Sequence, residues 1–296
     1  MKKVLFEGAG TAIVTPFTDE GVNYDEFKKL IEFQIDEGID AIIVCGTTGE
    51  ASTMSDDEKK DVIKFVVNTV DKRVPIIAGT GSNSTKHSIE LSKYAEEIGA
   101  DGLLLVTPYY NKTTQKGLIE HYKIIANSTK LPIILYNVPS RTSMNINPET
   151  YYELSKITNI VATKEASGDI SQIAETARLC GEDLMIYSGN DDQILPILSL
   201  GGIGVISVLS NILPYETSSM VKYYLFKDFD NALKLQLKLL PLIKALFSET
   251  NPIPIKAALN MLGYDIGTPR LPLIEISSSS IENLKKELIN YNLLNK

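Results

Sequence analysis

Short apolar runs rich in valine and isoleucine recur along the first three-quarters of the chain. Within a run, polar and apolar residues do not alternate, which is typical of strands covered on both faces of a parallel sheet. The runs lie at 10–15, 41–45, 75–79, 102–106, 132–136, 160–164, 184–188 and 203–208. The pattern therefore predicts eight parallel strands.

The segments between these runs carry the signals of helix starts and ends. Ser55-Asp56-Asp57-Glu58 is a capping box, in which the serine accepts from the amide of the glutamate and the glutamate reaches back. Acceptor side chains or proline at the first turn, and glycine after the last turn, mark other helices. The further predicted starts are Asn23, Asn147 and Asp169, and the predicted ends are Gly38, Gly99 and Gly181.

Strands that alternate with helices in this way are compatible with a doubly wound open sheet or with a closed (β/α)8 barrel. An open sheet for nucleotides usually carries Gly-x-Gly-x-x-Gly after its first strand, whereas the first run here ends in Thr15-Pro16-Phe17. We therefore predict an α/β fold, a TIM barrel over residues 1–226 that carries the active site. Residues 227–296 are expected to form a C-terminal helical region that packs through an apolar stripe. The stripe consists of Ala232, Leu235, Leu239, Leu240, Ile243, Leu246 and Phe247.

Composition and charge narrow the range of partners. The 296 residues include 29 Lys and Arg against 37 Asp and Glu, a formal charge of −8. An acidic chain is a poor candidate for phosphate-backbone binding, so no nucleic-acid partner is expected. No run approaches the ~18 apolar residues of a membrane span, and Glu7 interrupts the apolar start that a signal peptide needs. We expect a cytoplasmic, soluble protein, with Cys45 and Cys180 as core residues.

Lys164 is the most informative residue at the predicted strand ends. It follows the apolar run Ile160–Thr163, so its amine should project into the barrel mouth. A buried ammonium is costly unless it is paired, and a dry, unpaired amine can form a Schiff base with a carbonyl substrate. The structural alternative is an ion pair with Glu165 or another acid at a strand end.

Three other strand ends offer polar groups near the same mouth. The Tyr136 phenol could move protons between the amine and a substrate oxygen, or could simply cap the core. Thr47 and Thr48 follow Gly46 and offer hydroxyls and backbone amides suited to a carboxylate. Arg141 could bind a second carboxylate bidentately, with a solvated surface arginine as the alternative.

Other chemistries are less well supported. Gly79-Thr80-Gly81 lacks the Gly-Lys-Ser/Thr of a P-loop. Acidic residues at strand ends could suggest magnesium, although Asp191 and Asp192 are expected to cap the next helix, and no metal site is predicted. His87 and His121 fall inside helical patterns and are expected at the surface or in packing. The four acids are Glu50, Glu165, Asp191 and Asp192.

Several motifs, in the same order and nearly from end to end, resemble the signatures of the dihydrodipicolinate synthase family of pyruvate-dependent class I aldolases. They are Gly46-Thr47-Thr48-Gly49-Glu50, Thr107-Pro108-Tyr109-Tyr110-Asn111, Tyr136-Asn137-Val138-Pro139-Ser140-Arg141-Thr142, Lys164-Glu165-Ala166, Asn251-Pro252-Ile253-Pro254-Ile255-Lys256 and Arg270-Leu271-Pro272-Leu273. A series of motifs is far more specific than any one of them.

The resemblance implies roles for the catalytic residues. Lys164 would form a Schiff base with pyruvate, and no other cofactor is implied. Tyr136, Thr47 and Tyr110 would form a proton relay, with Tyr110 reaching the mouth from a neighbouring subunit. The family usually forms a homotetramer of two tight dimers, so a homo-oligomer is expected.

The resemblance also implies how substrates are held. Thr48 would bind the pyruvate carboxylate, and Gly189 and Ile206 would line the pocket through backbone groups. Arg141 would receive the carboxylate of L-aspartate 4-semialdehyde. Condensation would give 4-hydroxy-tetrahydrodipicolinate, in the lysine and diaminopimelate pathway.

One region departs from the feedback-inhibited members of the family. Those members carry histidines and an acidic residue that hold the amino acid lysine at the dimer interface. The matching positions here are Asp56, Lys59 and His87, although Asn83 is kept. Because Lys59 would repel the ammonium of a bound lysine, weak or absent inhibition by L-lysine is expected.

Two alternative functions stay open at this point. A sister enzyme on the same scaffold, such as N-acetylneuraminate lyase or a keto-deoxy sugar acid aldolase, shares the lysine, the tyrosine and the pyruvate chemistry. Thr47-Thr48 and Ser140-Arg141 favour a short acid over a sugar chain. A non-catalytic keto-acid sensor would keep the pocket but could lose the nucleophile.

Overall fold

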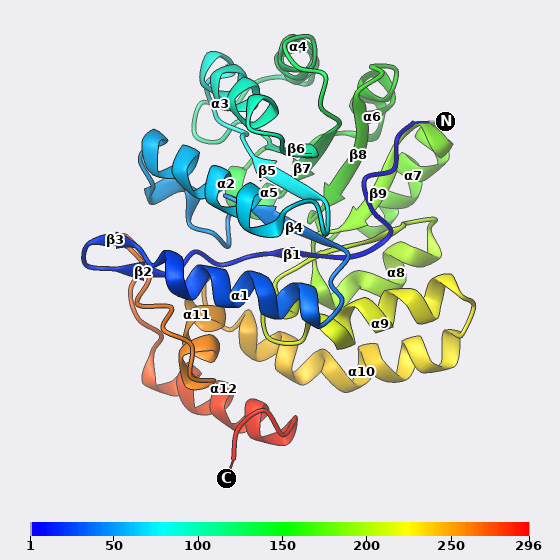
Figure 1. The fold of residues 1–296 in the computed structure, drawn as a ribbon. Coiled ribbons are helices and arrows are strands. Elements are labelled where there is room, and N and C mark those ends of the chain that lie inside the picture. The colour runs from blue at the N-terminus through cyan, green and yellow to red at the C-terminus, as the bar shows by residue number, and fades with distance from the viewer. Residues whose placement is uncertain (1, 296) are drawn as a thin grey trace.

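The computed structural model describes residues 2–295, and its strands form one closed parallel barrel in the order β1-β10-β9-β8-β7-β6-β5-β4 (Figure 1). Met1 and Lys296, the ends of the two predicted regions, lie outside the described residues. The strands are β1 (Gly8–Ala12), β4 (Ala41–Val44), β5 (Ile76–Gly79), β6 (Gly102–Val106), β7 (Ile133–Asn137), β8 (Ile160–Glu165), β9 (Met185–Ser188) and β10 (Gly204–Ser207). Pairing of β1 with both β10 and β4 closes the ring, which confirms the predicted TIM barrel.

The first strand differs from its predicted place. It spans Gly8–Ala12, whereas residues 10–15 were expected. Beyond it the chain forms a small antiparallel hairpin of β2 (Phe17–Thr18) and β3 (Gly21–Val22), outside the barrel. Each strand of this hairpin has only two residues, too few to show a strand pattern in the sequence, so the hairpin was not predicted.

Helices surround the barrel, as Figure 1 shows. They are α1 (Tyr24–Asp36), α2 (Asp56–Val70), α3 (Thr85–Glu97), α4 (Gln115–Ala126), the short α5 (Pro139–Thr142), α6 (Pro148–Ser155), α7 (Ile170–Cys180), α8 (Ile194–Ser199) and α9 (Pro214–Leu225). Three more follow: α10 (Phe229–Leu246), α11 (Ile253–Met261) and α12 (Ser278–Asn290). None of the helices within residues 2–295 has the length and apolar character needed to cross a membrane.

Most predicted caps are present. Ser55 and Glu58 form the reciprocal capping box, and the side chains of Asn23 and Asp169 accept from the third amides of α1 and α7. Asn147 differs, because Pro148 starts α6 but the asparagine side chain makes no capping hydrogen bond.

The expected capping role of Asp191 and Asp192 is wrong. The residue before α8 is Gln193, and its side chain makes no capping bond either. Asp191 is buried, and its Oδ2 accepts hydrogen bonds of 3.0 Å from the amides of Val208 and Leu209, just after β10. Burial raises the pKa of this carboxyl above its usual range, against the hydrogen bonds that favour its charged form.

The hydrophobic core has two layers, one inside the barrel and one between the strands and the surrounding helices. Alternate strand residues such as Ile134 and Tyr136 face inward, whereas Ile133 and Leu135 pack against the helices. Cys45 and Cys180 are both buried, as expected of core residues. The inward parity carries Lys164 into the barrel interior, because it is the register partner of Tyr136.

The C-terminal helices pack on one side of the barrel, where α10 lies against α9 and α12 lies against α10 and α11 (Figure 1). Within the predicted stripe, Ala232, Leu239, Ile243 and Leu246 are buried. Phe247 is exposed, since it follows the last turn of α10. The stripe therefore serves chiefly as packing, as its helical spacing indicates.

Candidate active site

Tyr136 and Lys164 form the centre of the site. They occupy matching positions at the carboxyl ends of the neighbouring strands β7 and β8. The Nζ of Lys164 lies 4.5 Å from the centroid of the Tyr136 ring, and each residue is 6% exposed. The strand register alone therefore places a phenol beside an amine within the barrel mouth.

Glu165, the neighbour of Lys164, does not pair with it. The carboxylate of Glu165 faces the opposite side of the strand and accepts hydrogen bonds from Tyr151 at 2.5 Å, Ser167 at 2.8 Å and Asn137 at 3.2 Å. Burial raises the pKa of Glu165 despite these bonds. Within residues 2–295, no carboxylate lies within 4.0 Å of the Lys164 amine. The structure thus contradicts the alternative of a Lys164–Glu165 ion pair.

The loop after β4 carries the two predicted threonines. Thr47 lines a cavity, and Thr48 is buried, with its Oγ1 accepting a 3.0 Å hydrogen bond from Nδ2 of Asn251. The loop ends at Glu50, which adopts a left-handed conformation with φ of 55°. Sequence reasoning did not find the contact of Asn251, because its partner lies in a segment distant along the chain.

Glu50 fixes this loop to the C-terminal region. Its Oε1 lies 2.7 Å from Nζ of Lys256, and both side chains are 1% exposed. Its Oε2 accepts a 2.8 Å hydrogen bond from the backbone amide of Arg270. A carboxylate that looked like a possible metal ligand is therefore engaged by protein groups. Within residues 2–295, no three His, Cys, Asp or Glu side chains gather as a metal site would require.

The remaining predicted residues lie at the carboxyl ends of β7, β9 and β10. Arg141 is on α5, directly after β7, and its Nη2 donates a 3.1 Å hydrogen bond to the carbonyl of Asn251. Gly189 follows β9, and its amide donates to the carbonyl of Glu165 at 2.6 Å. A Cβ on Gly189 would lie 2.9 Å from that carbonyl oxygen, so the close approach favours glycine. Ile206 is fully buried on β10.

Tyr110 is the exception among the predicted residues. It follows β6 with φ of 68° and is 94% exposed, whereas its neighbour Tyr109 lines the cavity. A tyrosine with this exposure does not contribute to the site of its own chain. The structure therefore brings the other predicted side chains toward one mouth but leaves Tyr110 on the surface.

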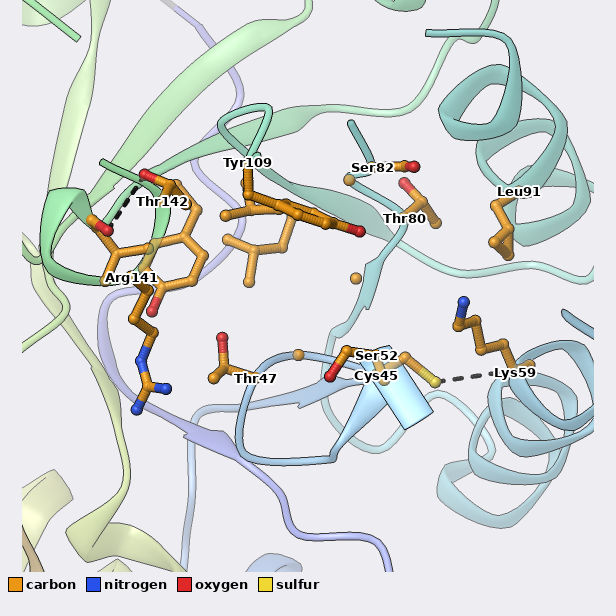
Figure 2. A pocket seen from close by; sticks show the side chains of 18 of the residues that line it. Cys45, Thr47, Ser52, Lys59, Thr80, Ser82, Leu91, Tyr109, Arg141 and Thr142 are labelled. Atoms are coloured by element: carbon orange, nitrogen blue, oxygen red, sulfur yellow. Dashed lines mark hydrogen bonds between the residues drawn. The ribbon is translucent and has the colours of Figure 1, made fainter. Parts of the chain in front are cut away.

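A cavity of about 330 Å³ opens beside the tyrosine–lysine pair. Figure 2 shows Thr47 and Arg141 on one side of it and Lys59 on the other, with Tyr109 between them. Lys164, Thr48, Gly189 and Ile206 are not among its lining residues. Lys164 instead lies against the ring of Tyr136, which is part of the cavity wall.

Two glycines that line the cavity, Gly79 and Gly81, allow the ends of β4, β5 and β6 to approach closely. A Cβ on Gly79 would lie 2.1 Å from the carbonyl oxygen of Cys45, and one on Gly81 would lie 2.3 Å from the amide of Val106. No real Cβ approaches backbone so closely, so both positions require glycine. The Gly79-Thr80-Gly81 segment thus serves close packing of strand ends, in agreement with rejection of a phosphate loop.

Lys59 and His87, which depart from the feedback-inhibited pattern, line the cavity away from Arg141, and the third departing residue, Asp56, contacts both of them. Asp56 lies 2.9 Å from Nε2 of His87 and 3.5 Å from Nζ of Lys59. The Nδ1 of His87 lies 3.2 Å from the hydroxyl of Ser82. Asn83 donates to the carbonyl of Tyr109 at 3.1 Å. Asp56, Lys59 and His87 therefore join α2 to α3, whereas Asn83 joins the loop before α3 to the loop after β6.

A model of the dihydrodipicolinate synthetase family matches residues 5–290. The chain belongs to this family. It is 58% identical over 294 residues to the 4-hydroxy-tetrahydrodipicolinate synthase of Acetivibrio thermocellus, covering 99% of this chain and 100% of that protein. It is 60% identical over 290 residues to the corresponding synthase of Caldicellulosiruptor saccharolyticus, covering 98% of both.

Solved structures of the dihydrodipicolinate synthetase family share the fold closely. The chloride-inhibited dihydrodipicolinate synthase of Acinetobacter baumannii, in complex with pyruvate, is 43% identical with a TM-score of 0.95, covering 97% of this chain and 99% of that one. The chain is accordingly an enzyme of the lyase class, a member of the family that acts in lysine and diaminopimelate biosynthesis.

Proposed function

We propose that this enzyme condenses pyruvate with L-aspartate 4-semialdehyde through a Schiff base at Lys164. The main support is the buried Lys164 amine, which has no carboxylate within 4.0 Å among residues 2–295 and lies against the phenol ring of Tyr136 at the barrel mouth. The amine adds to the ketone carbon of pyruvate, and loss of water from the carbinolamine gives an imine. Loss of a methyl proton then gives the enamine.

The enamine carbon attacks the aldehyde of the second substrate and forms the new carbon–carbon bond, while the aldehyde oxygen takes up a proton. The amino group of the former semialdehyde next attacks the imine carbon and displaces Lys164. Ring closure gives 4-hydroxy-tetrahydrodipicolinate, with one water released over the whole reaction. The protein residues supply the nucleophile and the proton transfers. We propose no cofactor besides the covalently bound substrate.

The remaining residues receive roles within the same proposal. Tyr136, Thr47 and a Tyr110 from a second copy of the chain carry protons between the amine and the substrate oxygens. The exposure of Tyr110 in a single chain supports donation between subunits, and we propose a dimer of dimers in the cytoplasm. Thr48 binds the pyruvate carboxylate, with backbone groups of Gly189 and Ile206 beside it. Arg141 binds the carboxylate of the semialdehyde.

The relatives support this choice of substrates. The Acinetobacter baumannii enzyme is a complex with pyruvate, and the relatives from Acetivibrio and Caldicellulosiruptor are synthases of the same product. The position of Arg141 beside the cavity supports a short charged acid as the second substrate rather than a sugar chain.

A paired assay tests the proposal. The enzyme is incubated with pyruvate and L-aspartate 4-semialdehyde, and separately with N-acetylneuraminate and with keto-deoxy sugar acids. We expect condensation with the semialdehyde and no cleavage of the sugar acids. Cleavage without condensation would identify a sugar-acid aldolase, and binding of pyruvate with no turnover of any substrate would identify a sensor.

We further propose that L-lysine inhibits this enzyme weakly or not at all. The proposal is supported by the Lys59 ammonium in the cavity wall and by the mutual contacts of Asp56 and His87, which occupy the polar groups there. Like charges repel, so a second ammonium is disfavoured beside Lys59. Half-maximal inhibition by sub-millimolar L-lysine would contradict this proposal, and Lys59→His is the variant expected to strengthen any inhibition.

A further inference from the structure

Asn251 connects the two side chains that are proposed to bind substrate carboxylates. It lies just before α11, in the C-terminal helical region, and is only 5% exposed. Its Nδ2 donates to Oγ1 of Thr48 at 3.0 Å, and its backbone carbonyl accepts from Nη2 of Arg141 at 3.1 Å. A single residue from outside the barrel thus contacts groups that follow β4 and β7.

The hydrogen bond to Thr48 has a defined polarity. A threonine hydroxyl has one hydrogen to donate and two positions at which it can accept. Because the Asn251 amide donates to the oxygen, the hydroxyl hydrogen stays available for a different acceptor. A carboxylate is an acceptor only. The amide therefore leaves Thr48 with the donor that binding of pyruvate requires.

The orientation of the amide supports this polarity. Within residues 2–295, Oδ1 of Asn251 is buried without a hydrogen-bond partner. The flipped amide would instead leave the N–H₂ group without a partner, and an orphaned buried donor is the rarer of the two cases. The arrangement with Nδ2 toward Thr48 is thus the better one.

We propose that Asn251 is a positioning residue that orients the Thr48 hydroxyl toward the pyruvate carboxylate. This inference rests on the proposed function. Among residues 2–295, the side chain of Asn251 makes its one hydrogen bond to Thr48, the proposed pyruvate-binding residue, whereas its hydrogen bond with Arg141 uses the backbone carbonyl. A side-chain substitution therefore acts on pyruvate and spares the semialdehyde.

Two variants and one control test this role. Asn251→Asp presents a carboxylate that accepts from Thr48, turns its hydrogen away and repels the pyruvate carboxylate. Asn251→Ala removes the contact without adding charge. Thr250→Ala changes the exposed neighbouring residue and serves as the control. The measurements are kcat, the KM of each substrate, the thermal midpoint, and the pyruvate concentration for half-maximal borohydride trapping.

For Asn251→Asp we expect the KM and the half-trapping concentration of pyruvate to rise about tenfold or more, the effect of losing a hydrogen bond to a charged group. Asn251→Ala should raise both by a smaller factor. The KM of the semialdehyde should stay within about twofold in every variant, since the backbone contact with Arg141 persists. The control should match the wild type.

Equal increases in both KM values, or a fall in kcat alone, would overturn the role of Asn251. So would an unchanged pyruvate requirement in Asn251→Ala, which decides the matter if Asn251→Asp does not fold. These results leave the proposed function intact as long as pyruvate traps the wild type. Failure to trap the wild type would overturn the proposed function and this inference together.

Discussion

At the scale of single residues, the site depends on the parity of two strands. Tyr136 faces the barrel interior, and Lys164 faces the same way because it is the register partner of Tyr136. The next residue, Glu165, faces outward into a separate hydrogen-bond network. An acid one position away in sequence is thereby kept from the amine.

Replacement of Tyr136 by phenylalanine tests the proposed proton transfer. The ring and its packing are retained, and only the hydroxyl is lost, so the fold should persist. General acid–base catalysis contributes about 10²–10⁴ in rate, and we expect kcat to fall within that range. Steady-state kinetics and a thermal melt of the same sample provide the check. A variant that turns over at a rate near that of wild type would remove Tyr136 from the relay.

His121 gives a second prediction at this scale, about stability. It is buried on α4 with Nδ1 against the hydroxyl of Thr85 at 2.8 Å, and burial lowers its pKa to about 4. The unfolded chain binds a proton at a higher pH, near the ordinary value of ~6.5, so folding disfavours the charged form. The contribution of the neutral His121 to the free energy of unfolding should be fully present above pH ~6.5. It should be lost as the pH drops toward ~4.

Urea unfolding at several pH values measures this effect. The midpoint of the wild type should fall between pH ~6.5 and ~4, and His121→Gln should show a shallower fall over the same window. Parallel curves for the two proteins would show that His121 is not responsible. The loss of stability at low pH would then result from protonation of carboxylates.

Residue-level interpretation from sequence succeeded where burial and strand parity decide the environment, as for Lys164. It failed for Asp191, because the amides of Val208 and Leu209, beyond the next strand, compete successfully for its carboxylate. It named Asn251 only within a family motif and did not predict its contacts with Thr48 and Arg141, which join distant segments. No local pattern encodes a contact of that kind.

At the scale of elements, the C-terminal helical region holds the loop after β4 in place. Local side-chain patterns predicted the eight barrel strands, the first of them displaced, and most of the helix caps. They predicted packing for α10, whereas the engagement of the loop by Lys256 on α11 could not be anticipated. The region is therefore both a packing element and a support for the threonines of the site.

Breaking the buried Glu50–Lys256 pair should destabilise the enzyme strongly. Among residues 2–295, Lys256→Met leaves the buried Glu50 carboxylate with the amide of Arg270 as its one hydrogen-bond partner. Loss of one member of a buried pair costs about 3–5 kcal/mol. The free energy of unfolding in urea measures the loss. The double variant Lys256→Met, Glu50→Gln should recover part of it.

The exposed pair Lys156–Glu153, 2.7 Å apart, provides the matched control. Lys156→Met should change the free energy of unfolding by less than about 1 kcal/mol. Equal effects of the two lysine substitutions would show that burial of the Glu50–Lys256 pair does not determine its contribution.

At the scale of the whole molecule, a single chain leaves the proposed relay incomplete. Tyr110 is 94% exposed on its own chain, so its place in the relay depends on association. A two-fold symmetric dimer would exchange the tyrosine between both sites at once, since such an interface is self-complementary. Assembly would then be a condition of activity as well as of stability.

Co-expression of two inactive variants tests this exchange. A Lys164→Ala chain supplies an intact Tyr110 to a Tyr110→Phe chain, which in turn has an intact Lys164. Random pairing makes about half of the dimers mixed, each with one complete site, so about a quarter of wild-type activity should return. Tagged chains isolate the mixed dimers for assay. No recovery in isolated mixed dimers would place Tyr110 outside the partner's site.

The proposed covalent bond between Lys164 and pyruvate can be detected by reductive trapping. The enzyme is reduced with borohydride in the presence of pyruvate, and its peptides are mapped by mass spectrometry. Lys256 is an internal control, because it is also buried, at 1% exposed against 6% for Lys164, but is paired with Glu50. We predict one reduced pyruvate adduct, on Lys164, and an unmodified Lys256. The absence of any adduct, or an adduct on a different lysine, would contradict a Schiff base at Lys164.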